Sequence, residues 1–195
     1  MPSKPLLNRF EPGKYYHVFN RGNNKEVTFY DDFAYYFFLE KYQEFLTDFV
    51  DTLAYVLMPN HYHFLIRVKD SSTVKDGKVI SNQFRKLSLT YTIRINSMKD
   101  RTGAIFTRGL RKKSVDNMNY LKQLIFYIHH NPQKHSIVKD YRNYNFSSYK
   151  AHLKDGNNIV SKDHVLSIFN NDISEFRSFH KVLQSENQII KYLME

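Results

Sequence analysis

Residues 51–68 have the sequence DTLAYVLMPNHYHFLIRV, two apolar runs separated by Pro59 and Asn60. Branched and aromatic residues dominate both runs, and a Pro-Asn pair is typical of a tight turn. The second run is almost continuously apolar, as expected for a strand in the interior of a sheet. This stretch therefore predicts a β-hairpin with strands over 51–58 and 61–68.

The residues on either side of this hairpin extend the pattern. Alternating or helical spacing predicts a strand over 15–20, helices over 33–49 and 80–98, a strand with a basic bend over 103–115, and a helix over 118–131 that Pro132 stops. The order of these elements indicates an α+β fold, a ferredoxin-like antiparallel sheet with helices packed on one face.

The C-terminal part of the chain has weaker periodicity. Short helices are expected over 160–169 and 173–183, after a polar linker at 154–158, and residues 70–78 read as a loop. We therefore divide the chain into a catalytic domain over 1–140 and a small, mostly helical C-terminal extension over 141–195.

The composition favours a nucleic-acid partner. Among 195 residues there are 29 Lys and Arg but 19 Asp and Glu, a formal net charge of +10. There is no cysteine, so a metal would need histidine, carboxylate or amide ligands. The chain also has no apolar signal core and no membrane-length apolar run, which predicts a soluble, cytoplasmic protein without a membrane partner.

His61 and His63 are the first candidate site residues. Positions i and i+2 of a strand point to the same face, so the two imidazoles can converge on one cation, while Tyr62 points to the opposite layer. A His-x-His pair by itself more often consists of surface or hydrogen-bonded histidines than of metal ligands. Its place in an apolar strand just after a turn favours the metal site, which needs a third ligand.

The helix over 118–131 offers that third group. Leu121, Leu124, Ile125 and Ile128 form its apolar stripe, and Tyr120, Tyr127 and Asn131 line up along the edge of that stripe. Tyr127 and Asn131 are one turn apart, so a phenol and an amide oxygen can reach the same point. Alternatively, Tyr127 is a ring at the edge of the core and Asn131 belongs to a helix stop.

Two motifs together resemble a known family. Met58-Pro59-Asn60-His61-Tyr62-His63 and Tyr127-Ile128-His129-His130-Asn131-Pro132 are similar to motifs of the REP-associated tyrosine transposases, within the HUH endonuclease superfamily. The resemblance spans about residues 12–150 and includes Phe146-Ser147-Ser148-Tyr149. It implies that His61, His63 and Asn131 bind Mg²⁺ or Mn²⁺ beside the nucleophile Tyr127. Tyr120 is the second candidate for the nucleophile, because it lies on the same helix edge and the chain departs from the family pattern at Gly109-Leu110.

The resemblance implies cleavage and rejoining of single-stranded or hairpin DNA through a 5′-phosphotyrosine. The oligomeric state stays open between a monomer and a homodimer. Basic residues expected to line the DNA groove are Arg85, Lys86, Arg94, Arg108, Arg111, Lys112 and Lys113. Two alternatives stay open: a relative that binds nucleic acid without cutting it, and a metal-dependent phosphodiesterase that activates water.

Overall fold

The computed structural model describes residues 9–70, 77–154, 156 and 159–185. The strands are β1 (Tyr15–Arg21), β2 (Val50–Met58), β3 (His61–Val68) and β4 (Arg111–Val115). The helices are α1 (Asp32–Leu46), α2 (Lys78–Lys99), α3 (Met118–Lys134), α4 (Tyr149–Leu153), α5 (Lys162–Ile168) and α6 (Ile173–Ser185), with short 3₁₀ turns η1 (Asn23–Lys25) and η3 (Tyr141–Asn143).

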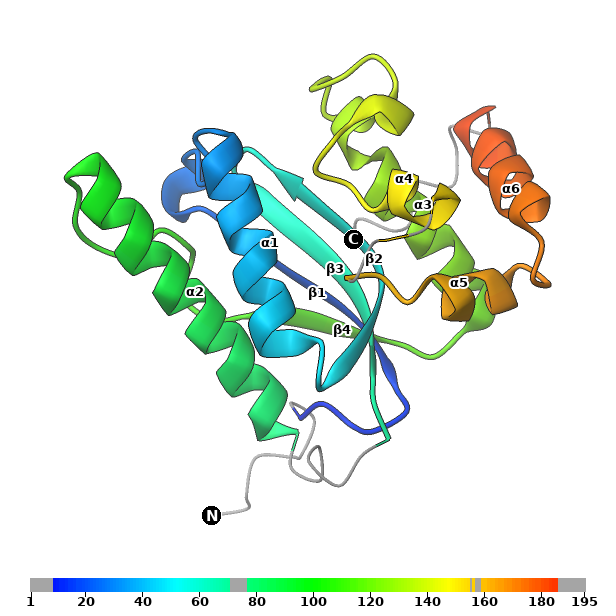
Figure 1. Ribbon diagram of the computed structural model, residues 1–195, viewed down its shortest axis with the longest axis horizontal. Helices are drawn as coiled ribbons and strands as arrows, with labels where there is room; N and C mark the ends of the chain where they lie inside the picture. Colours follow the sequence, from blue (N-terminus) through cyan, green and yellow to red (C-terminus); the bar gives the residue numbers. More distant parts are fainter. Residues whose placement is uncertain (1–8, 71–76, 155, 157–158, 186–195) are drawn as a thin grey trace.

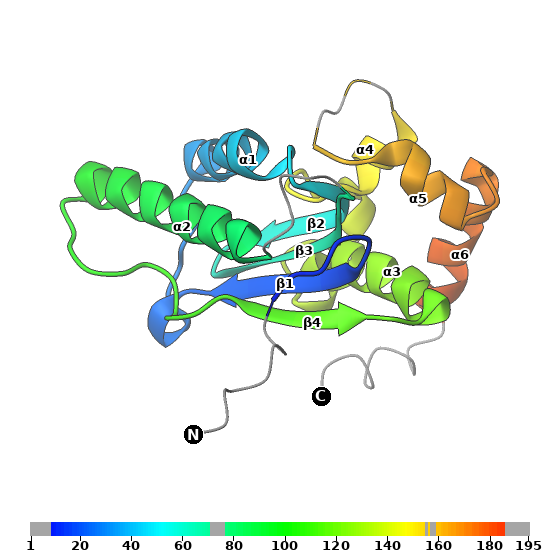
Figure 2. The ribbon, with the colours of Figure 1, turned by 90° about the horizontal axis from the view of Figure 1, so that it is seen from below.

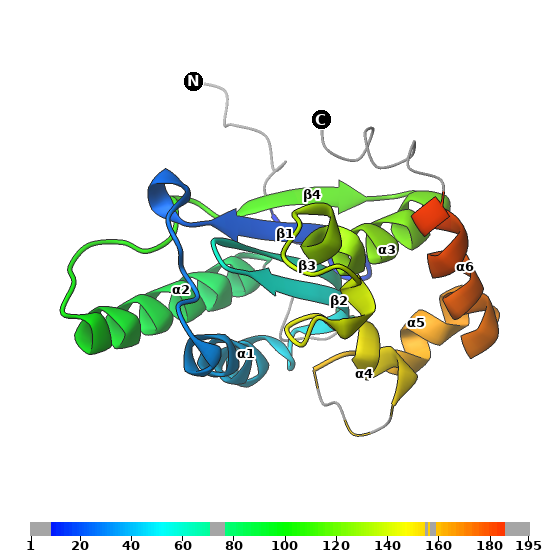
Figure 3. The ribbon, with the colours of Figure 1, turned by 90° about the horizontal axis from the view of Figure 1, so that it is seen from above.

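The four strands form one antiparallel sheet in the order β2-β3-β1-β4 (Figure 3). The hairpin predicted from residues 51–68 is present, with Met58 opposite His61 and Val50 opposite Val68. The chain order strand, helix, strand, strand, helix, strand with this arrangement is the ferredoxin-like topology. The predicted α+β class and antiparallel sheet are confirmed.

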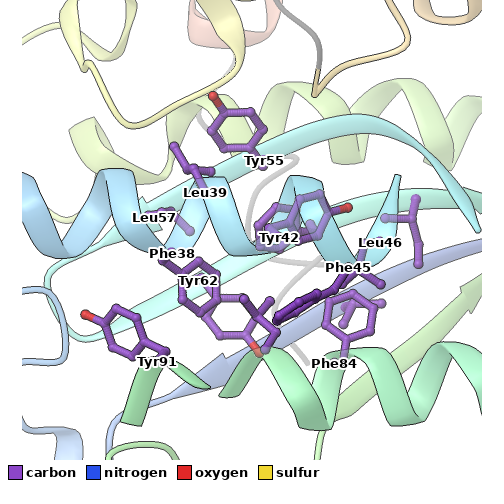
Figure 4. Packing of buried hydrophobic residues seen from close by; sticks show 14 of the residues in the cluster. Phe38, Leu39, Tyr42, Phe45, Leu46, Tyr55, Leu57, Tyr62, Phe84 and Tyr91 are labelled. Atoms are coloured by element: carbon purple, nitrogen blue, oxygen red, sulfur yellow. The ribbon is translucent and has the colours of Figure 1, made fainter. Parts of the chain in front are cut away.

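Helices α1 and α2 lie side by side and cover one face of the sheet (Figure 1). The Asp31 carboxylate caps the start of α1 by accepting the Ala34 N–H at 3.0 Å. Aromatic rings fill the space beneath both helices (Figure 4), and the rings of Tyr42 and Phe64 stack at 4.1 Å. Tyr62 is fully buried in this layer, which confirms the predicted direction of its side chain.

Helix α3 packs on the opposite face, and α4 to α6 gather around it (Figure 2). The prediction that the helices occupy one face is therefore corrected. The physical reason is the composition of β3, in which Phe64 and Ile66 point toward α1 and α2 while Leu65 points toward α3. A strand that is apolar on both sides needs cover on both sides.

The boundaries of α1, β4 and α3 differ from the predictions in ways that have a structural reason. Helix α1 ends at Leu46 rather than Phe49, and β4 covers only 111–115, because residues 103–110 form an irregular segment with one bridge from Phe106 to Gly22. Helix α3 continues through Pro132 to Lys134. Proline removes one N–H from the helix, but the His135 N–H still bonds to the Asn131 carbonyl at 2.9 Å and closes a last turn.

The C-terminal segment forms helices close to those predicted, α5 and α6. Part of the predicted linker (155, 157 and 158) and most of the predicted loop (71–76) lie outside the described residues. The division of the chain near residue 140 stays a prediction. Among the described residues, no helix combines the length and apolar character needed to cross a membrane.

A buried chain of hydrogen bonds ties α3 to α6. The His180 Nδ1 lies 2.8 Å from the Phe176 carbonyl oxygen, so it is the protonated nitrogen of that ring. The His180 Nε2 must then accept from His129 Nδ1 at 2.9 Å, and the His129 Nε2 accepts from the Ser148 hydroxyl at 2.8 Å. All three side chains are fully buried, so this chain serves structure rather than contact with a substrate.

Acid is expected to weaken this packing. Burial lowers the pKa of His180 from 6.5 to about 4 and holds the pKa of His129 well below 6.5. As the pH falls below 6.5, the unfolded chain binds protons that the folded chain does not, so the free energy of unfolding decreases toward pH 4. The slope is about 1.4 kcal/mol per pH unit for each such histidine. Urea denaturation followed by circular dichroism from pH 7.5 to 4.5 measures it.

The matched variant for this measurement is His180→Gln, which keeps a hydrogen-bonding side chain but cannot titrate. The slope of its free energy of unfolding against pH is expected to be smaller than that of the wild-type protein by about 1.4 kcal/mol per pH unit, which is the contribution of one proton. A stability that is flat between pH 6.5 and 4.5 would contradict the expectation.

Candidate active site

The sheet face that α3 covers carries three histidines at one end. Alternation along β3 places His61 and His63 on this face, and alternation along β1 places His17 there. Phe19 pairs with His63 in the β1–β3 ladder, so His17 is the diagonal neighbour of His63. The ring centroids of His61 and His63 are 5.2 Å apart, and those of His17 and His63 are 5.0 Å apart.

Each of the two strand histidines uses its Nδ1 in a hydrogen bond to a neighbour. His61 Nδ1 lies 2.6 Å from the Asn60 side-chain oxygen, and His63 Nδ1 lies 2.8 Å from His17 Nε2. The Nε2 atoms of His61 and His63 are not used in these bonds. This is the outer-shell arrangement in which a metal-binding histidine is oriented through its second nitrogen.

Helix α3 brings Tyr127 and Asn131 to the same place. The Tyr127 ring lies edge-on to His63 at 5.9 Å and to His17 at 6.4 Å between centroids. Asn131 is fully buried one turn later, and its amide donates to the Tyr127 carbonyl at 3.0 Å. Among the described residues no ring contact joins Tyr120 to these histidines, although Tyr120 lies half-buried on the same helix.

The Asn131 side-chain oxygen is a buried acceptor in this site. It is buried, and no hydrogen bond reaches it within the described part of the chain. The bond from its amide nitrogen to Tyr127 fixes which end of the side chain is the oxygen. A buried acceptor without a donor costs free energy unless a ligand completes it.

Burial sets the protonation of the site. It lowers the pKa of His61 and of His17 from 6.5 to about 4, and it holds the pKa of His63 well below 6.5. All three imidazoles are neutral at pH 7. Burial also raises the pKa of the Tyr127 phenol, an effect that the nearby Asn131 amide partly offsets.

The side chains around the histidines carry positive charge. Arg21 contributes to lowering the pKa of His61, Lys113 contributes to lowering that of His17, and Lys134 contributes to lowering that of His63. Lys134 also lies over the Tyr127 ring, with its Nζ 5.4 Å from the centroid. His135 packs edge-on to His61 at 5.4 Å. Such a positive surface attracts an anion, and phosphate is the anion of nucleic acids.

A divalent cation fits the residues present. His61 and His63 are neutral and each retains one nitrogen lone pair, while Asn131 supplies a hard oxygen. Within the described ranges no three His, Cys, Asp or Glu side chains form a metal-binding group, so the amide is needed as the third protein ligand. Because no carboxylate contributes, water and phosphate oxygens would complete the coordination.

The predicted DNA-binding residues lie on different faces of the sheet. Arg111 and Lys113 share the face of His17 and Tyr127, because they alternate with Lys112 along β4. The Lys112 ammonium points to the other face, where it lies 4.0 Å from the Phe10 centroid and makes no hydrogen bond among the described residues.

A groove of about 710 Å³ lies on that second face, between α2 and residues 103–112. Arg85, Arg108 and Lys112 line it. Lys86 and Arg94 instead lie over the rings of Phe45 and Phe33, at 4.0 and 5.5 Å from the centroids. The predicted basic groove is therefore separated from Tyr127 by the sheet.

Sequence reasoning missed His17, Lys134 and His135. His17 could have been found, because the ferredoxin-like strand order places the strand over 15–20 beside the strand over 61–68. Lys134 and His135 could not, since Pro132 was expected to end the helix before them.

No family model and no curated protein matches the chain. Solved structures do match its fold. One is a REP-associated tyrosine transposase bound to a REP hairpin, with a TM-score of 0.57 and 15% identity over 77% of this chain and 85% of that chain. Another is a bacterial tRNA(His) guanylyltransferase (Thg1)-like protein in complex with GTP, with a TM-score of 0.47 and 13% identity over 66% of this chain and 67% of that chain.

Proposed function

We propose that this protein is a divalent-metal-dependent DNA-nicking enzyme and strand transferase that uses Tyr127 as its nucleophile. The observation that carries the proposal is the position of the Tyr127 ring 5.9 Å from His63, one helical turn from the unpartnered oxygen of Asn131. The same site would also suit the chemistry of a transposase.

The proposed step exchanges one phosphoester bond for another. The Tyr127 phenol oxygen attacks the phosphorus of a DNA phosphodiester, and the bond from phosphorus to the 3′-oxygen breaks. The phenol proton leaves and the 3′-oxygen gains one, so the products are a 5′-phosphotyrosine and a free 3′-OH. Attack by that 3′-OH, or by another one, restores a phosphodiester and releases the tyrosine.

Residues of this chain would hold the metal ion and supply positive charge for the phosphate. His61, His63 and Asn131 would hold Mg²⁺ or Mn²⁺, which when bound neutralises charge on the phosphate and favours the phenolate. Arg21, Lys113 and Lys134 surround the same histidines and would attract the phosphate. Burial of Tyr127 raises its pKa, so the phenol depends on these positive charges for activation.

The fold supports DNA as the first substrate to test, since the REP-associated transposase with this fold was solved with a hairpin. Purified protein should be incubated with labelled single-stranded and hairpin DNA, with Mg²⁺, Mn²⁺ or EDTA, and resolved on a denaturing gel. A metal-dependent, protease-sensitive adduct is expected.

Two other results would identify other functions. Salt-dependent binding without an adduct or cleavage would indicate a protein that binds nucleic acid without cutting it. Cleavage that persists after Tyr127→Phe would indicate a phosphodiesterase that activates water at the same histidines.

The groove beside α2 is proposed to bind another segment of the DNA strand. Arg85 and Arg108 are exposed on its walls. The double variant Arg85→Glu, Arg108→Glu is expected to weaken binding of single-stranded DNA about tenfold and to reduce the slope of log K against log salt by about 1.4, the value for two phosphates. Fluorescence anisotropy at several salt concentrations measures both.

The control for net charge is Arg177→Glu, Lys181→Glu, because both side chains are exposed on α6 and the total change in charge is the same. Equal losses of affinity in the two double variants would show that the groove contributes nothing beyond general charge.

A further inference from the structure

His17 is buried beside the candidate site but has no part in the reaction as proposed above. It is 7% exposed, and its Nε2 lies 2.8 Å from Nδ1 of His63. Its ring also packs against Phe19, with centroids 4.8 Å apart. A neutral imidazole carries one proton on two nitrogens, so this hydrogen bond decides which nitrogen of His63 has a lone pair.

The proton on His61 can be placed from its contacts. The Asn60 amide nitrogen donates to the Lys25 carbonyl at 3.1 Å, which identifies the other end of that side chain as the oxygen. An amide oxygen only accepts, so His61 Nδ1, at 2.6 Å from it, carries the proton. His61 Nε2 therefore has the lone pair that a cation needs.

The contact between His63 and His17 has two arrangements. Either His63 Nδ1 donates to His17 Nε2, or His17 Nε2 donates to His63 Nδ1. The second would put the His63 proton on Nε2 and direct an N–H into surroundings that include Lys134, whose ammonium lies over the Tyr127 ring beside His63. The first leaves a lone pair there, which the cationic surroundings favour. It also gives His63 the same tautomer as His61.

We propose that His17 is a positioning residue that accepts the Nδ1 proton of His63 and so reserves the Nε2 lone pair of His63 for a divalent cation. Asn60 does the same for His61. The two neighbours together present two imidazoles in the Nδ1-protonated form, which is the minor tautomer of free histidine. The His61 tautomer follows from its hydrogen bonds and the His63 tautomer from its hydrogen bond together with the cationic surroundings, whereas their use in cation binding rests on the proposed function.

The tautomers can be observed without metal, DNA or catalysis. Long-range ¹H–¹⁵N correlation spectra of the wild-type protein at pH 7.5 distinguish Nδ1-protonated from Nε2-protonated rings. Assignment uses His61→Gln and His63→Gln. We expect both His61 and His63 to carry the proton on Nδ1. An Nε2-protonated His63 in the wild-type protein would overturn the proposal.

The His17 variants test the direction of the bond. His17→Leu removes the acceptor and is expected to move the His63 proton to Nε2 and to weaken Mn²⁺ binding, measured by calorimetry with a DNA strand lacking a scissile phosphate, by about 10- to 100-fold. His17→Gln offers an amide oxygen and should restore the Nδ1 proton and most of the affinity. Thermal melts by circular dichroism establish that each variant is folded.

The possible outcomes distinguish the role of His17 in setting the His63 tautomer from the metal-binding function of the site. If His17→Leu leaves the His63 tautomer unchanged, His17 has only a packing role and the proposal fails. If wild-type protein shows the expected tautomers but binds no Mn²⁺, the proposed metal function fails while the hydrogen-bond assignment stands. His164→Gln is the control, because His164 is half-buried and contacts Tyr15 rather than the site.

Discussion

Tyr127→Phe is expected to abolish the covalent DNA adduct and to reduce cleavage by more than roughly 10⁴-fold, the scale on which removal of a nucleophile acts. The substitution removes a single oxygen and leaves the ring beside His17 and His63. The hydrogen bond from Asn131 is made to the backbone carbonyl of Tyr127, so it also persists. Binding of DNA should therefore remain within about twofold of wild type.

Tyr120→Phe is the matched control, since it makes the same chemical change on the same helix. Tyr120 is half-buried, and burial raises its pKa as it does for Tyr127. The control should keep the adduct. If Tyr120→Phe loses the adduct and Tyr127→Phe keeps it, the nucleophile is Tyr120. Mass spectrometry of the nucleotide-linked peptide identifies the residue directly.

Asn131 should give the second large effect. Asn131→Ala removes the unpartnered oxygen and is expected to lower metal-dependent cleavage by about 10²-fold or more, with His61→Ala acting in the same direction. The reason is that each removes one of the three protein groups that would hold the cation. Cleavage rates at increasing Mn²⁺ concentration should show a weaker apparent affinity as well as a lower maximum.

Asn131→Asp is a sharper test because it keeps the shape of the side chain. A carboxylate at this fully buried position should destabilise the protein without metal, and added Mn²⁺ should raise its melting temperature more than that of wild type. A carboxylate variant whose melting temperature does not respond to Mn²⁺ would argue against Asn131 as a ligand. Thermal shift in Mn²⁺ and in EDTA makes the comparison.

Much of the fold could be predicted because its signals are local. The Pro59-Asn60 turn between two apolar runs specifies the hairpin, and the 3.6-residue spacing specifies α1, α2 and α3. The helices on both faces could also have been inferred, since the continuous apolar character of β3 requires cover on each side. The extent of α3 could not, because a proline's effect depends on the bonds that follow it.

The candidate site was predicted in part. Period-two alternation put His61 and His63 on one face, and period-3.6 spacing put Tyr127 and Asn131 on one helix edge. The contact between these two pairs required α3 to pack against that face of the sheet. The basic residues were expected to line one groove, but they lie on both faces of the sheet. Alternation along β4 places Lys112 on the opposite face from Arg111 and Lys113.

The amino-acid sequence by itself determined the elements, the two pairs of candidate residues and the net positive charge, because each depends on neighbours within a few positions along the chain. Only the tertiary structure decided that Tyr127 meets His63, that the Asn131 oxygen is buried without a partner, and that His17 bonds to His63 across 46 positions of sequence. These contacts join residues from β1, β3 and α3, and packing of those elements alone brings them together.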